Sequence, residues 1–127
     1  MIGEPVELIV RKHFERPSSE KVKMFQGVPT GFVVDAQNGT GALDWRIKPL
    51  GANMRFAGPA MTADAEPRDC LPVQPAIALS RPGDVLVISN GGYDGAAVIG
   101  DNVTAMARNQ GLAAIVTDGL VRDIEGI

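Results

Sequence analysis

The pattern that most constrains the fold lies in residues 83–123, where two short apolar runs flank a segment with helical spacing. The first run is Val85-Leu86-Val87-Ile88, and the second covers residues 112–117. Apolar runs of this length with a helix between them are typical of parallel strands joined by a crossover. The sequence therefore predicts an α/β fold, a layered sandwich whose mostly parallel central sheet contains a βαβ unit over about residues 83–118.

The segment between the two runs begins as a loop and continues as a helix. Residues 89–95 are Ser-Asn-Gly-Gly-Tyr-Asp-Gly, a composition that favours a loop, and we expect this loop to extend to Gly100. Asp101 or Asn102 can cap the following helix, and Gly111 can end it.

This arrangement places candidate chemistry at one edge of the sheet. The loops after both parallel strands lie at the strands' carboxyl ends, where open α/β sheets bind ligands, so Asp101 and Arg122-Asp123 should share that edge. The free N–H groups of residues 101–103 could bind a carboxylate or phosphate, and Arg122 could bind the same anion through its planar guanidinium. Asp101 and Asp123 could hold a hard divalent cation through oxygen, directly or through water.

Two other interpretations of these residues stay open. Asp101 can serve only as a helix cap, and Arg122-Asp123 can be a solvated pair of charges, because caps and surface ions are common. A nucleotide-binding half-unit is the second alternative, since Asp118 ends a strand–loop–helix–strand series. The glycines of residues 89–95 do not form the G-x-G-x-x-G pattern, however, which argues against binding of nicotinamide or S-adenosylmethionine.

Composition and charge exclude several classes of function. The chain has 127 residues, 45% of them apolar, which suits one domain with a modest core. A net charge of −3 gives no support for binding to nucleic acid or to an anionic membrane. No run approaches the roughly 18 apolar residues of a membrane helix, and we expect a cytoplasmic protein. Cys70 is the single cysteine, so no internal disulfide can form, and we expect it to be a buried apolar residue.

The residue types missing from the βαβ unit narrow the chemistry. All four lysines precede the unit, so it offers no lysine for a Schiff base. His13 is the single histidine, and neither a G-x-S-x-G nucleophile elbow nor a Walker A motif occurs. The remaining set of carboxylates, one arginine and a helix N-terminus suits metal-assisted chemistry on a small anion.

Upstream of this unit the sequence predicts shorter elements. These are a helix that starts at 17–20 and breaks at 27–29, a helix from Thr30 to a stop at 38–39, a loop over 38–53, a strand over 54–65 and a helix over 71–79. We expect Phe32, Val33 and Ala36 to face inward from the second helix. Trp45 and Ile47 should hold the loop against the core.

A series of motifs extends over about residues 27–127. They are Gly27-Val28-Pro29-Thr30, Phe56-Ala57-Gly58-Pro59-Ala60, Arg81-Pro82-Gly83-Asp84-Val85-Leu86-Val87, Gly100-Asp101 and Thr117-Asp118-Gly119-Leu120-Val121-Arg122-Asp123. In this order they resemble the RraA-like family, which includes the 4-hydroxy-4-methyl-2-oxoglutarate aldolases and the RraA regulators of ribonuclease E. We therefore expect a single RraA-like domain over residues 1–127, truncated at its C-terminus relative to the family.

The resemblance implies a class II pyruvate aldolase that depends on magnesium or manganese, often with oxaloacetate decarboxylase activity, built as trimers or hexamers. By position, the backbone of Gly100-Asp101-Asn102-Val103 would hold the carboxylate of a small 2-oxo acid substrate. Arg122 would bind that substrate and stabilise the developing enolate. Asp123 would hold the metal ion, and Asp101 would order a catalytic water or the water shell of the metal.

One position departs from the pattern of the family, which usually continues Arg-Asp-x-x-Glu/Asp. Here Gly126 occupies the fourth place, and Glu125 lies one position early. This departure keeps an alternative function open, that of an RraA-type regulator that binds a ribonuclease without doing chemistry. The presence of both Arg122 and Asp123 favours the enzyme.

Overall fold

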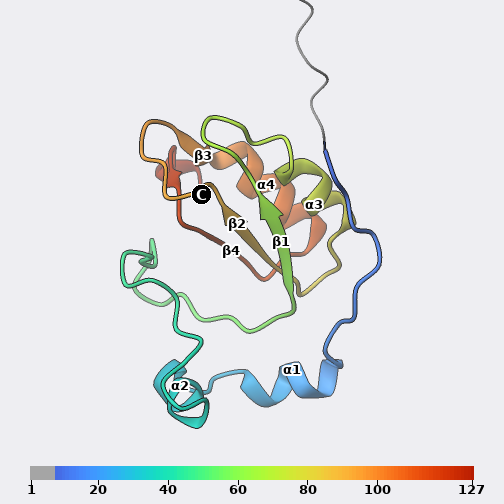
Figure 1. Cartoon of the computed structure of the whole chain (residues 1–127), viewed down its shortest axis with the longest axis vertical. Helices are drawn as coiled ribbons and strands as arrows, with labels where there is room; N and C mark the ends of the chain where they lie inside the picture. Colours follow the sequence, from blue (N-terminus) through green and yellow to red (C-terminus); the bar gives the residue numbers. More distant parts are fainter. Residues whose placement is uncertain (1–7) are drawn as a thin grey trace, which may run out of the picture.

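A computed structural model describes residues 8–127 and has the predicted α/β fold (Figure 1). The three strands of the central sheet are parallel and lie in the order β1-β2-β4, at Ala60–Asp64, Val85–Ser89 and Ala114–Thr117. Helix α3 (Val73–Leu79) lies between β1 and β2 in the chain, and helix α4 (Asp101–Gln110) lies between β2 and β4. The predicted βαβ unit is therefore confirmed, and the helix expected over 71–79 begins two residues later than predicted.

One face of the sheet carries the hydrophobic core. The strand register aligns Met61, Leu86 and Ile115 in one row across the sheet, and these side chains pack with those of α3 and α4. Leu86 has no exposed surface, and Ile88 is 1% exposed. Because fully burying such a side chain stabilises a fold by roughly 1.5–3 kcal/mol, β2 is the energetic centre of the domain.

A second, smaller sheet adjoins the first. Strand β3 (Ala97–Ile99) pairs in parallel with strand β5 (Leu120–Val121), with Ala97 opposite Leu120 and Ile99 opposite Val121. The expectation of an uninterrupted loop over 89–100 is therefore wrong. The reason is that β3 has only three residues and depends on a partner strand more than twenty positions away, so it leaves no local periodic signal.

The segment before β1 contributes little to the core. Helix α1 (Ser19–Phe25) begins where predicted, with Ser18 Oγ accepting the N–H of Lys21 at 3.3 Å, and helix α2 (Thr30–Ala36) follows it. Neither helix has a buried residue, and Figure 1 shows both set apart from the sheet. Phe32 is 68% exposed and Ala36 is also exposed, so the prediction that they face inward is wrong, whereas Val33 is half-buried. No helix within residues 8–127 is long and apolar enough to cross a bilayer.

The chain between α2 and β1 also differs from expectation. Trp45 is 76% exposed and does not hold the loop to the core; instead, the ammonium group of Lys48 lies 5.7 Å from the centre of its ring. The strand expected over 54–65 begins only at Ala60. Gly58 lies just before it, at a position where a Cβ would fall 2.2 Å from the carbonyl oxygen of Gly83, so no larger residue fits without a backbone shift.

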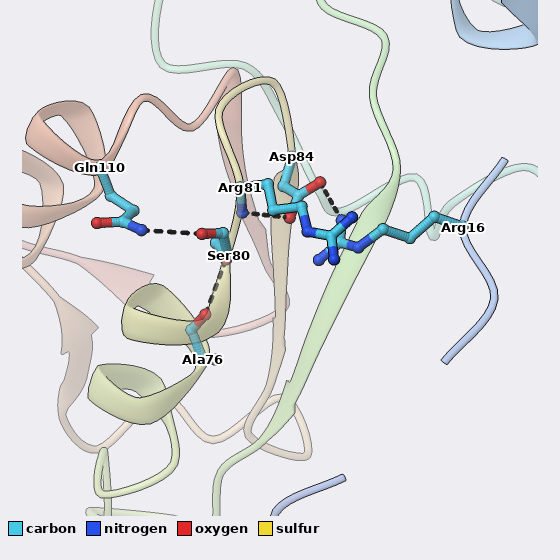
Figure 2. A network of polar contacts seen from close by, with 6 residues as sticks. All are labelled: Arg16, Ala76, Ser80, Arg81, Asp84 and Gln110. Atoms are coloured by element: carbon cyan, nitrogen blue, oxygen red, sulfur yellow. Dashed lines mark hydrogen bonds and ion pairs between the residues drawn. The ribbon is translucent and has the colours of Figure 1, made fainter. Parts of the chain in front are cut away.

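The N-terminal end of β2 is closed by a buried carboxylate. Asp84 is 2% exposed, and its two oxygens accept a hydrogen bond from Arg16 Nη1 and one from the N–H of Arg81, the latter at 2.8 Å (Figure 2). Next to this pair, the carbonyl oxygen of Ser80 accepts the Gln110 amide at 2.8 Å, which ties the end of α3 to the end of α4. A buried carboxylate needs such partners because desolvation penalises its charge. The contact also anchors the N-terminal segment to the sheet.

Replacing Arg16 tests the energetic importance of this contact. Arg16→Ala leaves the buried Asp84 carboxylate with a single backbone donor, so the free energy of unfolding should fall by about 1–3 kcal/mol. Urea denaturation measures the loss. Arg11→Ala is the matched control, because Arg11 is an exposed arginine of the same segment and should change stability by less than about 0.5 kcal/mol. Equal midpoints for the two variants would contradict the anchoring role.

Candidate functional site

The junction between β3 and α4 is built around Gly100. Gly100 is the N-cap of α4, and its carbonyl oxygen accepts the N–H of Thr104 at 3.0 Å and the Thr104 hydroxyl at 2.8 Å. Asp101 is the first helical residue, and its Oδ1 accepts the N–H of Asn102 at 2.7 Å. The cap is thus Gly100, which precedes both of the predicted cap residues, Asp101 and Asn102. Asp101 still lies at the positive end of the helix dipole, which favours its negative charge.

Strand β5 brings Arg122 and Asp123 to this junction. The N–H of Arg122 donates to the carbonyl oxygen of Ile99 at 3.1 Å, which continues the parallel pairing of β5 with β3. A Cβ placed on Gly100 would lie 3.1 Å from Arg122 Cγ, 3.4 Å from Arg122 Nε and 3.1 Å from Asp123 Oδ2. Both side chains therefore lie against Gly100, and a larger residue there would displace them by a few tenths of an ångström.

The two charged side chains at this position are open to solvent. Arg122 is 73% exposed and Asp123 is 50% exposed, with Arg122 Nε 3.5 Å from Asp123 Oδ2. They border a shallow open hollow lined by residues 121–126. An exposed ion pair of this kind is worth little, so an incoming anion or cation can replace either partner at low cost.

The backbone of Asp123 has an unusual conformation. Its φ of 57° and ψ of 42° lie in the left-handed region, which non-glycine residues seldom adopt. A single 3₁₀ turn, Ile124–Gly126, follows at once after the two charged residues. Asp tolerates this region better than most residues, and Asn38 and Arg68 of the same chain also have positive φ.

Gly126 makes a contact that the sequence gave no reason to expect. A Cβ at Gly126 would lie 2.8 Å from Asp101 Cβ, so the turn Ile124–Gly126 packs directly against the start of α4. Arg108 Nη2 donates to the carbonyl oxygen of Ile127 at 2.7 Å and ties the same segment to the last turn of the helix. The residue that departs from the family pattern is thus the one whose lack of a side chain permits this packing.

The structure brings most of the predicted site residues together. Arg122 and Asp123 lie against Gly100, and Asp101 follows Gly100 at the helix start, whereas the side chain of Val103 packs against the core and leaves only its backbone for a ligand. Within residues 8–127 there is no group of three or more His, Cys, Asp or Glu side chains that could enclose a metal ion. Mg²⁺ does not need such an enclosure, because it is commonly held by one or two carboxylates together with water and substrate oxygens. Asp123 and Asp101 each supply carboxylate oxygens, the donors that a magnesium-type ion prefers.

The nucleotide-binding alternative depends on Asp118, but the carboxylate of this residue is already hydrogen-bonded within the chain. Asp118 Oδ1 accepts the N–H of Asn90 at 2.7 Å, and its Oδ2 accepts the N–H of Gly92 at 3.0 Å. The carboxylate that would bind a ribose is therefore engaged by the glycine-rich loop itself.

Cys70, expected to be buried, is exposed. It lies in the turn between β1 and α3, where no core side chain covers it.

Asp44 and Arg46, in the loop before β1, form an ion pair that shifts the pKa of both residues. Two hydrogen bonds from the Arg46 guanidinium, at 2.9 and 2.8 Å, and one from its N–H hold the pKa of Asp44 well below its usual range. The same hydrogen bonds raise the pKa of Arg46, and the charge of Asp118 adds a smaller increase.

Comparison with known proteins identifies the family. The sequence matches the RraA-like family, described as Aldolase/RraA, over residues 30–127. The chain belongs to the RraA-like family. It is 40% identical over 103 residues to a protein of Halalkalibacterium halodurans provisionally named a 4-hydroxy-4-methyl-2-oxoglutarate aldolase, a match that covers 81% of this chain and 49% of that protein. The chain thus spans about half the length of the curated relatives that it matches.

Solved structures of RraA proteins share the fold. The RNA-processing inhibitor RraA from Thermus thermophilis superposes with a TM-score of 0.67 at 31% identity, covering 78% of this chain and 60% of that one. RraAS2 of Streptomyces coelicolor, described as an unusual member of the RNase ES inhibitor RraA family, gives a TM-score of 0.77 at 25% identity, covering 89% and 59%. The family thus includes relatives named as enzymes and relatives named as inhibitors.

Gly100→Ala tests the close packing at the site. The added methyl group would meet Arg122 and Asp123 and should displace both slightly; because these side chains are exposed, stability should change by less than about 1 kcal/mol. Two-dimensional ¹H–¹⁵N NMR should show the largest shifts at the amides of residues 122 and 123. Gly31→Ala is the matched control, because a Cβ there meets no atom within 4 Å. Shifts that spread evenly over the domain would contradict the local contact.

Proposed function

We propose that this protein is a metal-dependent, class II aldolase that cleaves 4-hydroxy-4-methyl-2-oxoglutarate-type substrates to pyruvate, with oxaloacetate decarboxylation as a second activity. The observation that carries the proposal is the packing of Arg122 and Asp123 against Gly100, at the start of a helix. An arginine and a helix N-terminus favour the same anion, and an adjacent carboxylate favours a cation. The names of the curated relatives support the same reaction class.

The proposed substrate is a small 2-oxo acid, and the chain's own groups suit its parts. Its carboxylate would bind to backbone N–H groups in the stretch Gly100-Asp101-Asn102-Val103. The guanidinium of Arg122 would bind the 2-oxo oxygen and stabilise the negative charge that develops there. Asp123 would hold Mg²⁺ or Mn²⁺, which when bound supplies Lewis-acid stabilisation of the same charge.

Bond cleavage requires a proton acceptor as well. In a retro-aldol reaction the 4-hydroxyl group loses its proton, the bond between C3 and C4 breaks, and its electrons pass into the enolate of pyruvate. A water molecule held by Asp101 is the proposed acceptor, because Asp101 lies at the helix start beside Gly100. No lysine lies between residues 83 and 127, which agrees with enolate stabilisation by charge and not by an imine.

A second candidate function is that of a regulator that binds a ribonuclease. The structural similarity to proteins described as RraA inhibitors favours it, as does Gly126 at a position where the family usually has an acid.

For either function we propose that copies of the chain assemble as trimers or hexamers. Apolar side chains that are more than half exposed before β1, such as Met24, Phe32 and Trp45, support an assembly.

The deciding experiment measures pyruvate release from 4-hydroxy-4-methyl-2-oxoglutarate and from oxaloacetate, with Mg²⁺ and with a chelator. The enzyme should be active only with the metal ion, and Asp123→Ala should lower activity by more than the roughly 10- to 100-fold typical of losing a group that merely supports a metal ligand. Asp94→Asn is the control, because it removes the same charge from an exposed position in the loop before β3. Activity that survives chelation, or survives Asp123→Ala at limiting Mg²⁺, would refute the assignment. No release from either substrate would favour the regulator.

Arg122→Lys tests the anion site separately. Lysine keeps the charge but lacks the planar fork that binds two oxygens, so oxalate, which resembles the pyruvate enolate, should bind more weakly. Hydrogen bonds to charged groups contribute about 1.5–3 kcal/mol, which corresponds to roughly a 10- to 100-fold rise in Kd. Isothermal titration calorimetry with Mg²⁺ present gives this ratio, and Arg55→Lys, an exposed arginine before β1, is the control. Unchanged affinity would remove Arg122 from the site.

A further inference from the structure

Three residues at the carboxyl end of the central sheet form a compact cluster, which we call the 90/118 clamp: Asn90, Asp118 and Gly119. Asp118 accepts the N–H groups of Asn90 and Gly92 at 2.7 and 3.0 Å, one on each carboxylate oxygen. Asn90 is 3% exposed, although it is polar and lies in a loop. Its Oδ1 accepts the N–H of Tyr93 at 3.2 Å, and its Nδ2 donates to the carbonyl oxygen of Tyr93 at 3.3 Å.

Steric contact closes the clamp on the other side. A Cβ at Gly119 would lie 2.6 Å from Asn90 Nδ2 and 3.0 Å from Val98 Cγ1. Gly119 follows β4, Asn90 follows β2 and Val98 belongs to β3, so both sheets meet at this point. The N–H of Gly119 also donates to Thr117 Oγ1 at 3.0 Å, which fixes the turn on its own strand.

The clamp lies immediately before the strand that carries the candidate site. Leu120 and Val121 form β5, and Arg122 and Asp123 come directly after it. Because β5 has only two residues, its own pairing with β3 is weak and gives little control over its position. The fixed turn at 118–119 is therefore the element that sets how β5 meets β3, and with it where Arg122 and Asp123 lie relative to Gly100.

We propose that Asp118 and Asn90 are positioning residues for Arg122 and Asp123: by fastening the glycine-rich loop to the turn before β5, they hold the anion-binding and metal-binding side chains over Gly100. The inference rests on the proposed function for the role of Arg122 and Asp123. The clamp itself rests only on the contacts described above. The electrostatic argument agrees with it, because charged acceptors form stronger hydrogen bonds to N–H groups than neutral ones do.

The first test does not depend on any activity. Asp118→Asn keeps the shape of the side chain but replaces one acceptor oxygen with an NH₂ group that faces an N–H donor. Hydrogen exchange followed by NMR should then accelerate about 10- to 100-fold at the Arg122 amide, which bonds to Ile99, as expected when a hydrogen bond to a charged group is lost. The amides of β2 should keep the wild-type rate.

Two further variants serve as a negative and a positive control for the exchange rate of the Arg122 amide. Asp94→Asn removes the same charge from an exposed position of the same loop and should leave the Arg122 amide unchanged. Gly119→Ala, which forces a methyl group onto Asn90, should accelerate exchange as Asp118→Asn does. If Asp118→Asn leaves the Arg122 amide at its wild-type rate, or accelerates exchange equally in β2, the residue only supports the fold and the proposal is overturned.

The second test asks whether the clamp matters for the ligand. With Mg²⁺ present, Asp118→Asn should raise the Kd for oxalate by about tenfold or more, as expected for a group that orients a ligand at one remove, while Asp94→Asn should not. Unchanged oxalate affinity in Asp118→Asn would overturn the proposal that the clamp positions a binding site. If the wild-type chain binds no oxalate, the proposed function fails, and the exchange experiment alone decides whether the clamp positions Arg122.

Discussion

The burial of β2 between two parallel neighbours is the constraint on which the rest of the structure depends. Leu86 and Ile88 of this strand have almost no exposed surface, and they pack against β1, β4 and both crossover helices. A polar residue closes each end of the strand: Asp84 binds Arg16 at the beginning, and Asn90 binds Asp118 at the end. Since the strand is fixed along its whole length, the loops that leave it start from defined positions.

The candidate site lies where the rigid sheet passes into short, weakly paired elements. Gly100 and Arg122 follow β3 and β5, which have three and two residues. Strands this short cannot hold charged side chains in place by their own pairing. The site depends instead on the turn at 118–119, on the packing of Arg122 and Asp123 against Gly100, on the turn after Asp123 and on the contact between Gly126 and Asp101. Each of these contacts requires a small residue or an unusual backbone conformation.

This dependence explains why one fold can serve two kinds of protein in the RraA-like family. The core needs only apolar strands and helices, whereas the proposed chemistry rests on Arg122, Asp123 and Asp101. A fold alone does not set a function, because the function depends on the residues of the site. In this chain the arginine and both carboxylates are present, and the departure at Gly126 lies directly against Asp101. The aldolase and regulator proposals therefore differ in the chemistry of a few contacts, and not in architecture.

The sequence by itself determined the βαβ unit, because the apolar runs that became β2 and β4 and the helix signals around Asp101 and Gly111 are all local. It also brought Asp101 and Arg122-Asp123 to a common edge, since parallel connections leave few other arrangements. Only the tertiary structure decided that β3 and β5 pair, that Gly100 and not Asp101 caps the helix, and that Phe32 and Trp45 are exposed. These features depend on contacts between residues far apart in the chain, or on the lack of a packing partner among the described residues. Hydrophobic periodicity indicates which residues favour burial, but it does not indicate which residues they pack against.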